Sequence, residues 1–491
     1  MTDFFWRDVI ATRAAVDPPL LDATESWSAA TVLAELDTVR ERLDGCRVLA
    51  VLADNSPAWV VADLAAQDAG VAHLPLPGFF SQAQLRHALE QTAADSVLTD
   101  QPERIGALDL QFAIIGTWRG LSWMRRVVDS IALPAGTAKV SFTSGSTGAP
   151  KGVCLSKRGL QDTARAVCAR LADLPLSRHL ATLPLALLLE NVAGSYAPVL
   201  RGMSVGLPPL ASLGWRGMAG FDPAALDTAV RSHEANSLIL VPELLKAWSL
   251  VLERSGRQAS DRLCFVAVGG ARVAPDLLKK ARGLGIPAGE GYGLTECGSV
   301  VSLNRPGDEG DGVGRPLDHA QVRIESGEVK VTTQAFLGYI GNPAEAGAEF
   351  PTGDLGTVDE RGHLHLSGRS KNLLITSYGR NIAPEWIESV LLAQPAILQA
   401  IVAGDGEPAP GAILVPAPGA QAGEIDAALR TANAALPDYA RIAHHLLTEP
   451  FTIQNGLATG NGRPIRTAIL ERYAAQLAAL NQPEESLHAV L

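Results

Sequence analysis

The sequence predicts an α/β protein with a large N-terminal domain and a smaller C-terminal domain. In the first part of the chain, segments with helical spacing alternate with short apolar segments, which is typical of βαβ units on a mostly parallel sheet with flanking helices. From about Ile324 the segments become short, β-rich and separated by glycine and charged turns, which indicates a small antiparallel subdomain. After Lys371 strand and helix patterns alternate again, so a second, α+β domain is expected there.

The individual elements follow from hydrophobic periodicity. Helices are expected at Ala29–Leu43, Trp59–Ala69 and Ser81–Gln91, and strands at Arg47–Leu52, Val71–Leu76, Ser96–Thr99, Ser237–Val241 and Leu263–Val268. The β-rich segments are Val322–Glu325, Glu328–Thr332, Gly356–Asp359 and His363–Leu366. C-terminal helices are expected at Glu385–Ala393 and Glu424–Leu436, with a strand at Ala400–Gly404. The predicted domains are residues 1–370, including a β-rich subdomain at about 322–368, and residues 371–491.

Composition restricts the class of protein. The chain has 491 residues, of which 47% are hydrophobic, so it can bury a sizeable core. It carries 41 Lys and Arg against 52 Asp and Glu, a net charge of −11, which argues against binding nucleic acid through a broad basic surface. Its five cysteines include no CxxC pair and indicate neither a disulfide framework nor a zinc cluster. With no signal-peptide pattern and no apolar run near the ~20 residues of a membrane span, we expect a cytoplasmic enzyme.

The segment Val140–Val153 has the composition of a phosphate-binding loop. It reads VSFTSGSTGAPKGV: the glycines allow tight turns with exposed N–H groups, the hydroxyls add donors, and the lysine adds positive charge. The spacing of the common nucleotide P-loop is absent. A flexible Ser/Gly loop would also have this composition, but the complete order SGSTGxPKG favours a cradle for a polyphosphate.

This loop and several further motifs resemble the adenylate-forming superfamily, which includes acyl-CoA synthetases, luciferases and the adenylation domains of peptide synthetases. The further motifs are GGA at Gly269–Ala271, GYGLTE at Gly291–Glu296, PTGD at Pro351–Asp354, DxxG at Asp359–Gly362, GRxK at Gly368–Lys371 and GRNIAP at Gly379–Pro384. All occur in the order of the superfamily and extend from about Trp27 to Tyr473. The resemblance implies ATP and Mg²⁺ as cofactors.

The resemblance also implies a role for each motif. The loop would hold the β- and γ-phosphates, Tyr292 and the GGA segment would line the adenine pocket, and Asp354 and Arg369 would bind the ribose. Thr295 would contact the α-phosphate, and Glu296 would bind Mg²⁺, which prefers oxygen ligands. The implied nucleotide-binding residues are Thr143, Ser144, Gly145, Ser146, Thr147, Gly148, Lys151, Gly269, Gly270, Ala271, Tyr292, Gly293, Thr295, Asp354 and Arg369. The implied catalytic residues are Lys151, Thr295, Glu296 and Arg463.

Three segments are similar to the long-chain acyl-CoA synthetase branch of this superfamily. They are LPLALLLE at Leu183–Glu190, LLITSYGRNI at Leu373–Ile382 and FTIQNGLAT at Phe451–Thr459. This similarity implies an aliphatic acid as substrate, and no acidic partner for the ammonium group of an amino acid is evident. Because the chain is shorter than many members of the branch, a medium-length or unusual acyl group is an alternative. The expected acyl-pocket residues are Leu187, Val192, Gly194 and Gly298.

Two positions depart from the pattern of the branch. Leu187 stands where the branch has histidine, and Arg463 stands where the superfamily has the lysine that bridges the substrate carboxylate and the α-phosphate. Arginine keeps the positive charge and can bind oxyanions with two donors, but its planar fork is bulkier. We therefore expect slower adenylation or an altered geometry rather than inactivity. Arg466 is a nearby alternative for this role.

The resemblance implies two half-reactions: formation of an acyl-adenylate, then transfer of the acyl group to a thiol. The C-terminal domain would rotate at Lys371 between them, and the loop with Gly379 would then line the thiol channel. The thiol could belong to CoA or to the phosphopantetheine of an acyl carrier protein. From Ser370 onward the chain has 7 Lys and Arg against 11 Asp and Glu, so no basic docking face for an acidic carrier is evident, which favours CoA. A non-catalytic nucleotide-binding relative is a third hypothesis, supported only by Arg463.

Overall fold

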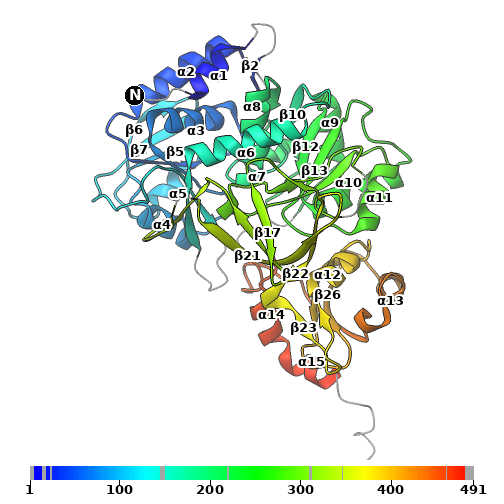
Figure 1. Cartoon of the computed structure of the whole chain (residues 1–491). Coiled ribbons are helices and arrows are strands. Elements are labelled where there is room, and N and C mark those ends of the chain that lie inside the picture. Colours follow the sequence, from blue (N-terminus) through cyan, green and yellow to red (C-terminus); the bar gives the residue numbers. More distant parts are fainter. Residues whose placement is uncertain are drawn as a thin grey trace, which may run out of the picture.

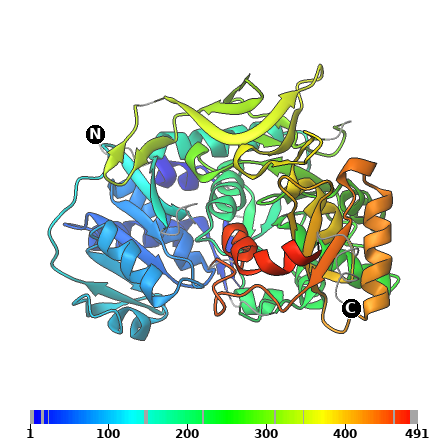
Figure 2. The same cartoon turned by 90° about the horizontal axis from the view of Figure 1, so that it is seen from below.

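A computed structural model describes residues 5–13, 18–22, 25–143, 150–217, 220–308, 312–345, 347–459 and 462–480. Figure 1 shows a large body, coloured blue to yellow-green, above a smaller yellow-to-red unit that holds α12–α15 and β23–β27. Seen from below in Figure 2, this smaller unit lies over the green half of the body rather than the blue half. None of the helices among the described residues is long and apolar enough to cross a membrane.

The first sheet of the body has nine strands in the order β20-β19-β9-β8-β4-β3-β5-β7-β6. Its central strands pair in parallel: β5 (Ser96–Thr99), β3 (Val48–Leu52), β4 (Ala72–Pro75) and β8 (Thr137–Thr143). The antiparallel flanks are β6 (Ala113–Trp118), β7 (Leu121–Arg125), β9 (Lys151–Ser156), β19 (Phe336–Tyr339) and β20 (Asn342–Pro343). The helices along this half are α1 (Phe5–Ala11), α2 (Ala29–Arg42), α3 (Pro57–Ala69), α4 (Gln82–Gln91) and α5 (Pro102–Gly106).

Local sequence signals explain where these helices begin and end. Ser56 accepts a hydrogen bond from Trp59 N at the start of α3, with Pro57 in the first helical position, where a missing N–H costs nothing. Gly70 ends α3 with φ = 72°, a left-handed conformation that glycine adopts without strain. Ser81 and Gln84 form a capping box at the start of α4. Most of α3 is buried, as expected for a helix packed between other elements.

The second sheet also has nine strands, in the order β16-β15-β14-β13-β12-β10-β11-β1-β2. Its parallel strands are β14 (Ala288–Tyr292), β13 (Phe265–Val268), β12 (Ser237–Leu240), β10 (Arg178–Leu180), β11 (Ser204–Gly206) and β1 (Leu20–Leu21). The antiparallel ends are β2 (Ser26–Trp27), β15 (Ser302–Leu303) and β16 (Arg315–Pro316). Helix α6 (Lys157–Arg170) follows β9 and contacts β8 and β9 of the first sheet. The later helices of the body are α7 (Leu188–Asn191), the π-helix η1 (Val192–Tyr196), α8 (Ala197–Arg201), α9 (Pro223–Ser232), α10 (Pro242–Arg254) and α11 (Pro275–Gly283), with short 3₁₀ turns η2 (Leu210–Leu213) and η3 (Thr295–Cys297).

The β-rich subdomain is a four-stranded antiparallel sheet in the order β17-β18-β21-β22, as the sequence predicts. The strands are β17 (Gln321–Glu325), β18 (Glu328–Thr332), β21 (Glu349–Val358) and β22 (Leu364–Arg369). The C-terminal part begins after the 3₁₀ turn η4 (Ser370–Asn372) with the hairpin β23 (Leu374–Ile375) and β24 (Asn381–Ile382). It continues with β25 (Ile397–Ala403), β26 (Gly411–Pro416) and β27 (His444–Leu447), the helices α12 (Pro384–Leu392), α13 (Ala422–Ala434), α14 (Arg466–Arg472) and α15 (Ala474–Leu480), and the 3₁₀ turn η5 (Asp438–Ala440).

These elements bear out the predicted fold class: two mixed sheets with parallel centres and flanking helices, a small antiparallel sheet, and a smaller α+β unit. Predicted helices and strands match observed ones with small shifts of their ends. The largest difference is β21, which begins at Glu349 although its predicted start is Gly356. Gly353 has φ = 72° and lies at a bulge, because β18 pairs with β21 at Pro351 and again at Leu355, while β22 pairs with it from Asp354 onward. Pairing on either side of this local turn therefore carries the strand through it.

Candidate active site

A cavity with a volume of about 1020 Å³ lies at the carboxyl ends of β12, β13 and β14. In parallel sheets these ends are where ligands usually bind. The β8–β9 hairpin, the β21–β22 edge and the C-terminal part supply the other walls. Pockets for drug-sized ligands have volumes of roughly 300–1,000 Å³, so this cavity lies at the upper end of that range.

Backbone carbonyls and glycines form the floor of the cavity. Gly269 and Gly270 directly follow β13, and Gly293 follows β14. A Cβ on Gly293 would lie 1.6 Å from Ser299 O, so only glycine fits this close approach. Gly270 has φ = 87°, a conformation that glycine adopts without strain. The residues of these two motifs that line the cavity are Gly269, Gly270, Ala271, Tyr292, Gly293 and Thr295.

One side of the cavity carries a chain of polar side chains that joins two sheets. The Tyr292 hydroxyl donates to Asp354 Oδ2 at 2.7 Å, and Arg369 Nε lies 2.9 Å from Asp354 Oδ1. Asp354 and Arg369 are cross-strand partners on β21 and β22. Burial raises the pKa of Asp354, although Arg369 counteracts the shift; burial and the neighbouring Asp354 raise the pKa of Tyr292. This arrangement offers an aromatic face beside a carboxylate and a guanidinium, which suits a nucleoside.

The phosphate side of the cavity lies at the mouth of the β8–β9 hairpin. Thr143 and Lys151 are cross-strand partners there, and the Lys151 ammonium lies 5.7 Å from the centre of the Tyr339 ring. The hairpin therefore presents a hydroxyl and a cation on either side of its loop. The predicted phosphate-binding residues Ser144, Gly145, Ser146, Thr147 and Gly148 lie outside the described residues.

Glu296 supplies the carboxylate for the predicted metal site. It lies in the 3₁₀ turn η3 beside Thr295, and its Oε1 accepts a hydrogen bond from the Tyr339 hydroxyl at 3.1 Å. Burial and Glu296 raise the pKa of Tyr339, so the hydroxyl stays a donor. The described residues contain no group of three or more His, Cys, Asp or Glu that could hold a metal ion. A single carboxylate fits Mg²⁺, which is commonly bound by one or two carboxylates together with substrate phosphates and water.

Arg463 reaches the cavity from the C-terminal part. Its Nη2 donates to Gly270 O at 2.6 Å, and both residues line the cavity. Arg466, the alternative, donates from Nη1 to Val402 O at 2.9 Å and pairs through Nη2 with the buried Glu388. Arg466 is thus occupied within the C-terminal part, and the geometry favours Arg463 as the cation of the site.

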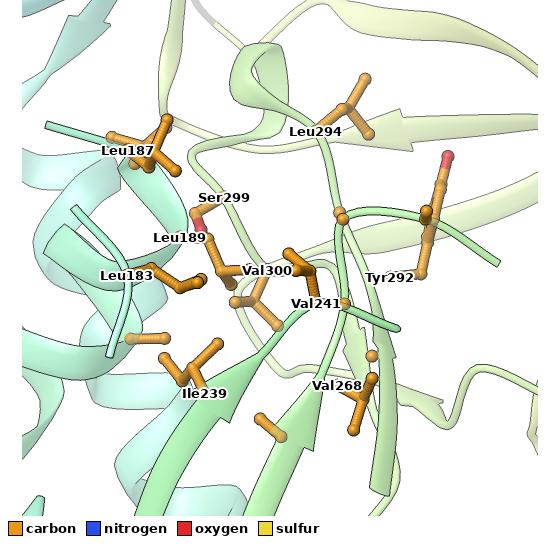
Figure 3. Close-up of a pocket in the computed structure, with 18 of the residues that line it drawn as sticks. Leu183, Leu187, Leu189, Ile239, Val241, Val268, Tyr292, Leu294, Ser299 and Val300 are labelled. Carbon is orange, nitrogen blue, oxygen red and sulfur yellow. The ribbon is translucent and has the colours of Figure 1, made fainter. Parts of the chain in front are cut away.

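The other end of the cavity has an aliphatic wall, part of which Figure 3 shows. Of the four residues expected in the acyl pocket, Leu187 lies on this wall, whereas Val192, Gly194 and Gly298 do not line the cavity. Val192 is packed in the core, and a Cβ on Gly298 would contact Ala335 at 2.7 Å. The lining side chains include Cys168, Leu171, Leu176, Leu183, Leu187, Leu188, Leu189, Ala193, Ala197, Met203, Ile239, Val241, Phe265, Val300 and Leu303.

A buried polar network lies next to this aliphatic wall. Glu190 is fully buried; its Oε1 is 2.9 Å from His179 Nε2 and its Oε2 accepts from Leu183 N at 3.0 Å. His179 Nδ1 is in turn 3.0 Å from Ser237 Oγ. Gly194 faces this network, because a Cβ there would lie 1.9 Å from Glu190 Oε1. The network fixes the orientation of α7 and η1 and so supports the wall from behind.

Several residues of the cavity were not predicted. Glu290, on β14, is only 7% exposed and accepts from Val273 N at 3.1 Å, and burial raises its pKa to about 7. Arg272 and Tyr339 also line the cavity. Glu290 stands two residues before Tyr292 in the GYGLTE region, so proximity to that motif was the only available signal for it. Tyr339 lies in no motif.

The predicted hinge and thiol-channel residues lie outside the cavity. Lys371 is exposed in the 3₁₀ turn η4, and Gly379 is exposed on the turn between β23 and β24. The cysteines next to the motifs are buried: burial raises the pKa of Cys154 to about 11 and raises that of Cys297 further. A thiol with so high a pKa is a poor nucleophile, which agrees with a structural role for both.

Comparisons with known proteins identify the family. The family model described as "AMP-binding enzyme" matches residues 28–335, and the "AMP-binding enzyme C-terminal domain" matches residues 371–485. A long-chain-fatty-acid–CoA ligase, FadD15 of Mycobacterium bovis, is 29% identical over 87% of this chain and 86% of its own length. A feruloyl-CoA synthase of an Amycolatopsis species is 29% identical over 87% of this chain and 88% of its own length. The structure of the Bacillus subtilis o-succinylbenzoate CoA synthetase MenE, with ATP and a magnesium ion, has a TM-score of 0.73 at 23% identity and covers 94% of this chain and 98% of MenE.

Proposed function

Since the chain belongs to the AMP-binding enzyme family of AMP-forming acid–CoA ligases, we propose that its substrate is an aliphatic, fatty-type carboxylic acid and its thiol acceptor is CoA. ATP would be the co-substrate and Mg²⁺ the cofactor. The observation that carries this proposal is the aliphatic wall beside the polar nucleotide wall within one cavity of about 1020 Å³. Such a wall stabilises an alkyl chain through burial of apolar surface, at roughly 0.8 kcal/mol per CH₂ group.

The first half-reaction would be attack of the substrate carboxylate on the α-phosphorus of ATP, with pyrophosphate as the leaving group. Tyr292, Asp354 and Arg369 would hold the nucleoside, and Lys151 would hold the leaving phosphates. Arg463 and Thr295 would stabilise the charge that builds on the α-phosphate, an electrostatic contribution that is large where water is excluded. Mg²⁺ bound at Glu296 would neutralise part of the phosphate charge.

The second half-reaction would be attack of the CoA thiolate on the acyl carbon of the adenylate, which breaks the bond to the phosphate oxygen and releases AMP. Arg463 occupies the cavity in this structure through its contact with Gly270 O, and the turn with Gly379 lies outside it. This arrangement suits adenylation. Rotation of the C-terminal part at Lys371 would withdraw Arg463 and bring the Gly379 turn to the cavity.

The polar groups near the aliphatic wall favour a hydrocarbon substrate over an acid with a second charged group. His179 is engaged by Glu190 and Ser237. Arg201 donates to backbone carbonyls of the turn that follows α6, including Leu171 O. Because these groups already have protein partners, the wall offers a second carboxylate or sulfonate little to bind.

The proposal is tested by ATP-dependent pyrophosphate release with hexanoate, laurate, palmitate, ferulate and o-succinylbenzoate. We expect turnover with the alkanoates and kcat/KM that rises with chain length until the wall is filled. Turnover with an aromatic acid and none with any alkanoate would overturn the aliphatic assignment. Each acid that reacts is then supplied with CoA or with a phosphopantetheine-bearing carrier protein. Thioester on the carrier protein and none on CoA would replace CoA by a carrier as the acceptor.

A further inference from the structure

Lys246 connects the body of the protein to its C-terminal part. It lies on α10 in the body, and its ammonium donates to Gln394 O and Ile397 O, each at 2.7 Å. Gln394 follows the end of α12, and Ile397 begins β25. Both carbonyls belong to the connection between α12 and β25, and an ammonium group has three donors with which it can bind them. Lys246 therefore links α10 of the body to the α12–β25 connection of the C-terminal part.

The surroundings show that this lysine is enclosed where the two parts meet. Ala393, which follows α12 and precedes Gln394, packs against an apolar cluster of the body that includes Leu244 and Leu245 of α10. Burial lowers the pKa of Lys246 to about 8, and the carboxylate of Glu243, one turn earlier on α10, counteracts the shift. An ammonium group is buried at such a place only when its hydrogen bonds compensate the lost hydration, as the two carbonyls do here.

The first turn of α10 is also close to Arg463. Val241, which precedes α10, lies with Arg463 around Gly270: a Cβ on Gly270 would be 3.6 Å from Val241 Cγ1 and 3.3 Å from Arg463 Nη2. Glu243 also acts electrostatically on Arg463. Burial lowers the pKa of the Arg463 guanidinium, and the negative charge of Glu243 counteracts this shift. The N-terminal end of α10 therefore meets the C-terminal part at two places. Lys246 donates to the α12–β25 connection, and Val241 lies beside Gly270, which Arg463 contacts.

We propose that Lys246 is a positioning residue for adenylation, which holds the C-terminal part in the orientation that places Arg463 in the cavity. This inference rests on the proposed function. The two contacts run in opposite directions, because Lys246 donates to carbonyls of the C-terminal part and Arg463 donates to a carbonyl of the body. Rotation at Lys371 would break both. The ammonium would then regain its hydration, which keeps the contact reversible, as alternation between two half-reactions requires.

The test compares Lys246→Met, which keeps the aliphatic stem, and Lys246→Arg, which keeps the charge, with the control Lys280→Met. Lys280 forms an exposed ion pair with Glu253 near the other end of α10, so its loss should leave the domain contact intact. Adenylation is measured as pyrophosphate release, and the thioester step is measured separately with synthetic acyl-adenylate and CoA. Amide hydrogen exchange at residues 393–398 reports the contact without need of activity.

For Lys246→Met we expect adenylation to fall about tenfold, the size of a lost charged hydrogen bond, while the thioester step stays unchanged or becomes faster. Exchange at residues 393–398 should accelerate by a similar factor. Lys246→Arg should recover most of the adenylation rate, and Lys280→Met should behave as wild type. Equal losses in both half-reactions would show a merely structural lysine and overturn the proposal, as would unchanged exchange. A wild type that adenylates no acid would refute the proposed function and the adenylation role together, while exchange would still decide whether Lys246 holds the contact.

Discussion

Replacement of Asp354 by asparagine tests the nucleoside wall of the cavity with little change in shape. Asp354 is 6% exposed, accepts from the Tyr292 hydroxyl at 2.7 Å and pairs with Arg369 Nε at 2.9 Å. The Arg369 side chain is 56% exposed, so water screens this ion pair and it contributes at most about 1 kcal/mol. In the wild type, burial of the carboxylate costs free energy, as the raised pKa of Asp354 shows. Asparagine is uncharged and removes this cost. We therefore expect the free energy of unfolding to change by less than about 1 kcal/mol.

The effect on nucleotide binding should be larger than the effect on folding. A carboxylate can accept hydrogen bonds from both ribose hydroxyls, and each hydrogen bond to a charged group contributes about 1.5–3 kcal/mol. Asparagine keeps one acceptor oxygen and replaces the other by a donor. A loss of about 2 kcal/mol corresponds to roughly 30-fold weaker binding of AMP.

The assay is titration calorimetry with AMP, together with denaturant unfolding of the same samples. Asp359→Asn is the matched control, because Asp359 directly follows β21 but pairs with His365 of β22 and does not line the cavity. We expect wild-type affinity for the control and roughly 30-fold weaker AMP binding for Asp354→Asn. An AMP affinity within about twofold of wild type in Asp354→Asn, with the fold intact, would refute the ribose role.

Three further variants probe the rest of the site. In Arg463→Met, pyrophosphate release should fall about 100-fold because the cation beside the α-phosphate is lost, while Arg463→Lys should stay within about threefold; unchanged release in Arg463→Met would assign the role to another group. Glu290 has a pKa of about 7 in the folded protein, above its ordinary value, so the folded state holds a proton that the unfolded chain releases. Wild type should thus lose up to about 3 kcal/mol of stability as pH rises from about 4.5 to 7, and Glu290→Gln should lack that loss; parallel denaturant curves at both pH values would contradict it. In Gly194→Ala the new Cβ would lie 1.9 Å from Glu190 Oε1, so the unfolding free energy should fall by about 1–3 kcal/mol. The control Gly423→Ala, whose Cβ has nothing within 4 Å, should not be destabilised. An unchanged melting temperature in Gly194→Ala would show that Gly194 is not packed tightly against Glu190.

Local patterns in the sequence were sufficient for most of the fold. The strand predicted at Ser96–Thr99 has those bounds in the structure, because four consecutive buried residues between turn signals leave little ambiguity. Helix α3 is similarly marked by Ser56, Pro57 and Gly70. Strand β21 shows the limit of such signals. Its PTGD segment has the local composition of a turn and contains a left-handed glycine, Gly353 with φ = 72°. Pairing with β18 and β22 around this bulge continues the strand, and nothing in the sequence indicates that pairing.

Long-range contacts explain the parts of the site that the sequence did not predict. Tyr339 reaches Glu296 and Lys151 because β19 adds to the edge of the first sheet beside β9, a pairing between segments far apart in the chain. The contact of Arg463 with Gly270 joins residues 193 positions apart. Motif order could predict that Lys151, Gly270, Glu296 and Arg463 share a site, but Tyr339 lies in no motif. The hydrogen bonds among these residues depend on how sheets and domains pack together.

The aliphatic wall shows how a local irregularity of a helix decides which side chains meet a substrate. Leu189, Ala193 and Ala197 line the cavity at intervals of four residues, while Glu190 and Gly194, each one position later, face the buried His179. Between them the backbone forms the π-helix η1, whose wider turn changes the register of the helix and is frequent at functional sites. The network of Glu190, together with the hydrogen bond from Asn191 Nδ2 to the buried Asp63 at 2.7 Å, holds this register from the polar side. Val192 and Gly194, which were expected in the acyl pocket, lie behind this wall.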